Sequence, residues 1–200
     1  KSFIKSLLSK PNLIIFSILS IMLFFVFSQF TFGIPRHAAF LNPETGPKIY
    51  GTLMTENALI VVFFTTIVLG ITSKLSSIKS VIAGSIFYFV GFGMLFFTYN
   101  FELMYLSAFL WSIGEILIST NTNVYLMNHT PVNHRGKFNA IFPIIRKVGS
   151  GASPLFAGYI ITYHNGNVPS MWIYYSIITL VSIAGLIYLN FYEKKTGPSE

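Results

Sequence analysis

Between residues 103 and 127 the chain reads LMYLSAFLWSIGEILISTNTNVYLM, with Glu115 as its single charged residue. A stretch of this length exceeds the ~20 mainly apolar residues that cross a bilayer as a helix. Stretches of similar length and character occur at 12–34, 51–71, 80–98, 141–163 and 170–192. Lipid offers no partner for free backbone groups, and the short alternating segments of a membrane barrel are lacking. The sequence therefore predicts an all-α membrane protein with six transmembrane helices.

The composition agrees with a membrane protein. Of the 200 residues 53% are hydrophobic and 10% are charged, and the mean hydropathy is +0.66. Soluble domains carry about 25% charged residues. The chain has no Cys, which excludes disulfides and Cys-ligated metals, and its first residue is Lys1, so we expect a segment of a longer protein.

The basic residues alternate between the two ends of the predicted helices. The first residues, the second and fourth connections and the tail carry nine of the thirteen Lys and Arg. By the positive-inside rule both termini are predicted to be cytoplasmic. We therefore expect a cytoplasmic head and inter-half linker at 1–11, a bundle at 12–192 and a cytoplasmic tail at 193–200. This placement accounts for most of the net charge of +7, and a nucleic-acid partner is not expected.

Three ionisable residues fall well inside predicted spans, Glu115, Arg146 and Lys147, whereas Glu56 lies near the outer end of the second span, where water can reach it. A charge at mid-bilayer costs at least ~2.5 kcal/mol, so each is a candidate functional residue. At helical spacing Trp111, Glu115 and Ser119 share one face, which predicts the wall of a water-filled cavity.

Two roles for Glu115 stay open. Removal from water disfavours the charged form of a carboxyl, so Glu115 is a candidate proton carrier. Its depth along the helix differs from that of Arg146 by only ~4 Å, so a structural ion pair is also possible. We expect Arg146 to face inward and Lys147 to reach back to the headgroups.

Weaker signals come from two amides, Gln29 in the first span and Asn57 in the second. The four His have no metal-ligand spacing, and we find no phosphate-binding loop and no nucleophile with a base. The sequence therefore predicts no metal, no cofactor other than a coupling proton, and no enzymatic activity.

Several local patterns resemble the C-terminal six-helix half of a major facilitator superfamily transporter, most like bacterial drug/proton antiporters. Gly70, Lys74 and Lys79 resemble a degraded copy of that superfamily's basic loop. The other patterns are Tyr50-Gly51 followed by Asn57, Gly114-Glu115-Ile116, and Pro131-x3-Arg135-Gly136-x-Phe138-x-Ala140.

The resemblance implies half of a twelve-helix fold, with the N-terminal half of the same transporter and the lipid bilayer as partners. It places Gln29, Asn57, Glu115 and Arg146 on or near the transport path, with Glu115 as the proton-coupling residue. It also implies alternating access with a small-molecule substrate, first of all export of lipophilic drugs by proton antiport. The alternatives are a proton-coupled peptide transporter, an exporter or flippase of anionic or lipid-linked molecules, and a membrane scaffold that transports nothing. We expect a multi-pass protein of the cell membrane, most simply the bacterial cytoplasmic membrane.

Overall fold

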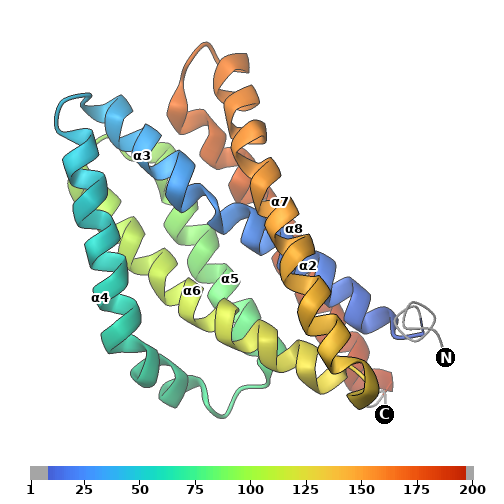
Figure 1. Cartoon of the computed structure of the whole chain (residues 1–200). Helices are drawn as coiled ribbons and strands as arrows, with labels where there is room; N and C mark the ends of the chain where they lie inside the picture. Colours follow the sequence, from blue (N-terminus) through green and yellow to red (C-terminus); the bar gives the residue numbers. More distant parts are fainter. Residues whose placement is uncertain (1–8, 197–200) are drawn as a thin grey trace.

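The computed structural model describes residues 9–196, which form a bundle of long helices joined by short connections (Figure 1). The all-α prediction is confirmed. The predicted head and tail lie partly outside the described residues. The helices are α2 (Pro11–Phe27), α3 (Gln29–Leu41), α4 (Gly46–Thr72), α5 (Ser77–Gly93), α6 (Phe101–His129), α7 (Arg135–Tyr163) and α8 (Met171–Thr196), with 3₁₀ turns at Met94–Phe97, Val132–His134 and Val168–Ser170.

Five helical stretches in the described residues are long and apolar enough to cross a membrane: Pro11–Leu41, Gly46–Thr72, Ser77–Phe97, Phe101–His129 and Val168–Lys195. The sixth predicted span, 141–163, lies inside α7. This helix has 29 residues, which is ample length, but Arg146, Lys147 and its Gly, Ser and Pro residues make it less apolar than the other five. That α7 also crosses the membrane stays a prediction.

The first span and the connection after it differ from their predicted form. The span 12–34 is interrupted at Ser28, and helix α3 continues through Pro35 to Leu41, where the sequence predicts a connection from 35 to 50. The turn that remains is short because the Asn42 side chain accepts hydrogen bonds from the backbone N–H groups of Glu44 and Thr45, both at 3.0 Å. Such a turn, closed by an Asn side chain, lets α3 and α4 follow each other closely.

The connections alternate between the two ends of the bundle (Figure 1). Helix α2 begins and α8 ends at one end, where the α4–α5 and α6–α7 connections also lie, whereas the α3–α4 and α7–α8 connections lie at the other end. Most Lys and Arg residues therefore gather at a single end, as the charge pattern predicts. Which side of the membrane this end faces stays a prediction.

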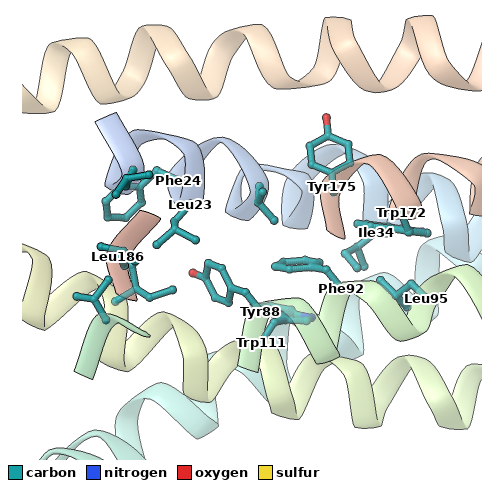
Figure 2. Close-up of a cluster of buried hydrophobic side chains, with 14 of the residues drawn as sticks. Leu23, Phe24, Ile34, Tyr88, Phe92, Leu95, Trp111, Trp172, Tyr175 and Leu186 are labelled. Carbon is teal, nitrogen blue, oxygen red and sulfur yellow. The ribbon is translucent and has the colours of Figure 1, made fainter. Parts of the chain in front are cut away.

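An aromatic cluster forms the centre of the core (Figure 2). Phe92 of α5 stacks with Trp111 of α6 and with Trp172 of α8, each with ring centroids 5.8 Å apart. All three side chains are fully buried. Offset stacking at this distance is favourable, so the cluster holds α5, α6 and α8 together.

Helices α5 and α6 approach each other most closely through glycines. A Cβ added at Gly84 would lie 2.9 Å from the Gly114 carbonyl oxygen, and one added at Gly114 would lie 2.6 Å from the Tyr88 ring. Small residues at such contacts allow close helix packing in membranes. Gly114 precedes Glu115, so this contact also fixes where Glu115 lies.

Candidate functional site

Glu115 lies near the middle of α6 and is held by a side chain from α4. Asn57 donates from Nδ2 to Glu115 Oε2 and to Ser112 Oγ, both at 2.9 Å. Ser112 Oγ in turn donates to the Ala108 carbonyl oxygen at 2.6 Å, so it is free to accept from Asn57. Both amide hydrogens are thus used, and the carboxylate is oriented by the neighbouring helix.

Beside Glu115 the structure contains a cavity of about 600 Å³, here called the Glu115 cavity. Helices α2, α3, α6 and α7 all contribute to its wall. Its volume is in the range of small-molecule binding sites. The lining residues are Phe24, Phe27, Ser28, Phe30, Thr31, Glu115, Ser119, Arg146, Lys147, Ser150, Gly151 and Pro154.

Two cations of α7 line this cavity together with the carboxylate. The Arg146 guanidinium carbon lies 4.4 Å from the centre of the Phe24 ring, a cation–π arrangement that holds the side chain against α2. Lys147 contributes to the wall of the cavity as well and is exposed, and that it reaches back to the headgroups stays a prediction. A pair only ~100° apart on a helix can share a cavity because the cavity is wide relative to one helix face.

Glu115 and Arg146 do not form an ion pair in this state. Within residues 9–196 the one salt bridge joins His129 and Glu193, with a nitrogen–oxygen distance of 3.7 Å. The carboxylate of Glu115 is bound to Asn57 instead, while Arg146 is stacked on Phe24. Glu115 and Arg146 therefore line the same cavity, but they do not form an ion pair with each other.

The interruption of the first span lies on the same cavity. At the end of α2 the carbonyl oxygens of Phe24 and Phe25 accept hydrogen bonds from Ser150 Oγ at 3.3 Å and from Ser153 Oγ at 2.7 Å, both on α7. Both carbonyls also accept locally, from the Ser28 backbone N–H at 3.0 Å for Phe24 and from Ser28 Oγ at 2.8 Å for Phe25, so α7 adds to the hydrogen bonds that end α2. Interrupted helices are typical of substrate sites in secondary transporters. Sequence reasoning missed this interruption, since Ser28 is an ordinary residue in an apolar run.

Gln29 lies beside Ser153 of α7, and its predicted place on or near the transport path stays a prediction. Its side chain is fully buried and donates from Nε2 to Ser153 Oγ at 2.6 Å, and it is not among the residues that line the Glu115 cavity. Tyr175 of α8 donates to the Ser153 carbonyl oxygen at 2.7 Å. Gln29 therefore belongs to a polar junction that joins α3, α7 and α8.

Trp111 and Ser119 share a predicted face with Glu115 but differ in surroundings. Ser119 lines the Glu115 cavity and its hydroxyl donates to the Glu115 carbonyl oxygen at 2.7 Å. Trp111 is fully buried behind the cavity, where it contacts Phe27 edge-on with ring centroids 6.0 Å apart and supports that wall residue. The aromatic wall formed by Phe24, Phe27 and Phe30 was not predicted, because the many Phe residues of the chain give no signal that separates lining from lipid-facing rings.

His37 is a buried histidine whose hydrogen bonds indicate a structural role. The Trp172 indole N–H donates to Nδ1 at 2.9 Å, so Nδ1 is the acceptor and Nε2 carries the hydrogen that is donated to the Thr98 carbonyl oxygen at 3.0 Å. Both nitrogens are thus used in joining α3 to α8 and to the turn before α6. Within residues 9–196 no group of three His, Asp or Glu side chains is placed to hold a metal ion.

Comparison with known families agrees with this architecture. The family profile described as Major Facilitator Superfamily matches residues 18–200, nearly the whole chain. The chain therefore belongs to the major facilitator superfamily, a family of membrane transporters that are generally not enzymes. A search of curated proteins finds no match to it.

Proposed function

We propose that the chain is one half of a proton-coupled secondary transporter whose substrate carries an anionic group. The observation that carries the proposal is the shared Glu115 cavity: one membrane-embedded carboxyl and two cations face the same space. Ionisable groups in such positions typically mark the path of a substrate or a coupling ion. The predicted N-terminal half would close the site from the other side.

Glu115 is the proton site in this proposal. Deprotonated Glu115 offers a negative charge to Arg146, and protonation withdraws it. A substrate anion and the Glu115 carboxylate then compete for the same guanidinium, so that proton binding and substrate binding depend on each other. Asn57 keeps the carboxyl oriented, since its amide can donate to either form.

The charges of the cavity favour an anionic or zwitterionic substrate. Arg146 and Lys147 both line the space, and Glu115 balances only one of them. Within the described part of the chain neither cation is neutralised by a salt bridge. The wall of Phe24, Phe27 and Phe30 would take an apolar or aromatic part of the substrate. The substrate class that fits best is therefore an amphiphilic organic anion or zwitterion, peptides included.

Export of lipophilic drugs is the second candidate. The aromatic wall supports it, because phenyl rings bind flat apolar molecules and cations. An unbalanced positive charge in the same cavity opposes it for cationic drugs. A scaffold that only locks helices would use the Glu115–Arg146 pair, and this pair is not formed in the described residues.

The proposal is tested by Glu115→Gln in the full-length transporter, reconstituted in vesicles that contain a pH-sensitive dye. The probes are a panel of aromatic carboxylates, dipeptides and lipophilic amines. We expect the original protein to move protons when an anionic or zwitterionic probe is added, and Glu115→Gln to abolish this proton movement while it still exchanges labelled probe for unlabelled probe.

Glu102→Gln is the matched control, because Glu102 is an exposed carboxyl in the first turn of the same helix. Proton movement that persists in Glu115→Gln at the original rate would contradict Glu115 as the proton site. A response confined to the amines would instead favour drug transport.

A further inference from the structure

A second acidic residue lies within a membrane helix, and the proposed function does not use it. Glu56 is ten residues into α4 and five residues inside the predicted span 51–71, about 8 Å from the outer end of that span at 1.5 Å per residue, and it directly precedes Asn57. Adjacent residues point about 100° apart on a helix, so Glu56 faces away from the Asn57–Glu115 contact. A carboxyl at this depth needs a partner or a function.

Glu56 lines a separate cavity of about 540 Å³ between α4 and α6, here called the Glu56 cavity, which is largely open on its outer side. Its wall shares no residue with the Glu115 cavity. At one border Thr52 and Tyr105 are hydrogen-bonded across the two helices through their hydroxyl groups. The lining residues are Thr52, Thr55, Glu56, Leu59, Ile60, Phe63, Phe64, Tyr105 and Phe109.

The wall of the Glu56 cavity combines one carboxyl group with mainly apolar side chains. Glu56 Oε2 is buried and has no hydrogen-bond partner among the described residues, whereas the rest of the wall is aromatic or aliphatic apart from the hydroxyl groups of Thr52, Thr55 and Tyr105. Phe64 and Phe109 meet edge-to-face, with ring centroids 6.0 Å apart, which fixes part of this wall. Glu56 is the only acidic or basic side chain on the lining, so the cavity is apolar and becomes negative when Glu56 is ionised.

This combination specifies a class of ligand. A buried carboxylate oxygen without a partner accepts a hydrogen bond most favourably from a charged donor. Aromatic rings beside it favour a cation over a neutral or negative group. An apolar wall of this volume accommodates a drug-sized hydrocarbon body.

We propose that the Glu56 cavity binds a lipophilic ammonium ion, whose N–H group donates to the Glu56 carboxylate while its apolar body packs against the aromatic rings. This proposal depends on the chain being a membrane transporter, and it does not depend on proton coupling at Glu115. Its preference for cations is opposite to that of the Glu115 cavity. The same chemistry is offered by a free amphiphilic amine and by the amine headgroup of a lipid.

The test uses the full-length transporter in nanodiscs of phosphatidylglycerol, a lipid without an amine. The probe is tritiated imipramine, a tertiary amine that is protonated at neutral pH. We expect saturable binding that Glu56→Gln weakens about tenfold or more, as removal of a charged partner for an ammonium predicts. Glu102→Gln, which removes an exposed carboxyl from α6 outside the cavity, should leave the affinity unchanged.

A second pair of variants does not depend on Glu56. Phe63 lines the cavity and is 66% exposed, so Phe63→Ala removes part of the wall with little loss of packing within the bundle. We expect a threefold to tenfold weaker affinity, an order-of-magnitude figure for a cation–π contact. Val62→Ala is the matched control, since Val62 is 70% exposed on the same helix and does not line the cavity.

The source of the amine is distinguished by changing the lipid. Weaker imipramine binding in nanodiscs of phosphatidylethanolamine identifies a lipid amine as a competing occupant, and unchanged binding identifies a free amphiphilic amine. The quaternary N-methyl form of imipramine lacks the N–H donor and should bind at least about tenfold more weakly. Absence of saturable binding in the original protein, as when lipid or the N-terminal half closes the cavity, would overturn the proposal. An unchanged affinity in Glu56→Gln would overturn it as well.

Discussion

Arg146 and Arg36 occupy similar local settings at different places in the molecule. Each guanidinium carbon lies 4.4 Å from the centre of a phenyl ring, that of Phe24 for Arg146 and that of Phe32 for Arg36. Arg146 lines the Glu115 cavity and Arg36 does not. The two residues therefore separate the effect of a cation–π contact from the effect of a charge in the cavity.

Replacing Arg146 with Gln should raise the KM for an anionic or zwitterionic substrate. The lost interaction is a hydrogen bond to a charged group, which corresponds to about a tenfold to hundredfold increase. Arg146→Lys should be intermediate because it keeps the charge and loses the planar donor pair. Arg36→Gln is the control and should leave KM unchanged. Equal effects of the two Gln variants in uptake assays would show that Arg146 acts through stability alone.

At the scale of residues, the contact between Glu115 and Asn57 shows which features of the site can be predicted from the sequence and which cannot. Periodicity and the cost of burial identify Glu115, Asn57 and Arg146 as candidates, because such residues are rare inside apolar spans. Depth along the helix allows a Glu115–Arg146 contact but says nothing about how each helix is rotated about its axis. That rotation depends on packing contacts such as Gly114 against Gly84, and it brings Asn57 to the carboxylate instead.

At the scale of elements, α5 and α6 depend on glycine at their closest approach. The added Cβ of Ala at position 114 would lie 2.6 Å from the Tyr88 ring and 2.8 Å from the Gly84 carbonyl oxygen, which is backbone and cannot turn aside. We expect Gly114→Ala to lower the melting temperature, at a cost of about 1–3 kcal/mol for overpacking. Thermal unfolding of the purified protein would measure this.

The same experiment needs a glycine in open surroundings as its control. Gly158 of α7 has no atom within 4 Å of an added Cβ, so Gly158→Ala should be neutral or slightly stabilising, since Ala favours helix more than Gly does. Equal melting temperatures for Gly114→Ala and the original protein would contradict the close contact. The prediction also concerns function, because displacement of α6 would move Glu115 away from Asn57.

Element boundaries were predictable where the chain itself marks them. Apolar length predicts the helices, and all six predicted spans overlap helices of the structure. The interruption at Ser28 was not predictable, because the chain has no Gly or Pro there and part of the hydrogen bonding at the end of α2 comes from α7, which is distant in sequence. Likewise, α3 continues through Pro35 although proline usually ends helices in water. Proline is better tolerated in membrane helices, where neighbouring groups satisfy the freed carbonyl.

At the scale of the whole molecule, the bundle exposes apolar side chains on α4 and α7. Val62 and Phe63 on α4 and Val148 and Leu155 on α7 are between 66% and 78% exposed. Apolar surface of this kind faces lipid or another protein. The N-terminal half, which stays a prediction, would cover part of it, and the shortage of apolar residues in α7 fits a helix that lines a polar cavity rather than one surrounded by lipid.

The predicted topology places both termini in the cytoplasm and lets α7 cross the membrane. It can be tested by cysteine labelling because the chain contains no native cysteine. Single cysteines are introduced in a full-length protein freed of its other cysteines, at Glu44 and Asn167 in the connections of one end and at Ser76 and Lys137 at the other. A membrane-impermeant maleimide added to intact cells should label positions 44 and 167 and should reach 76 and 137 only after permeabilisation, because the end rich in Lys and Arg is retained in the cytoplasm. Position 137 lies in the first turn of α7 and position 167 shortly after its end, so their labelling from opposite sides would establish that α7 crosses the membrane. Labelling of both from the same side would reduce the spans to five and move the C-terminus to the outside, and the Glu115 cavity would then need a different partner surface.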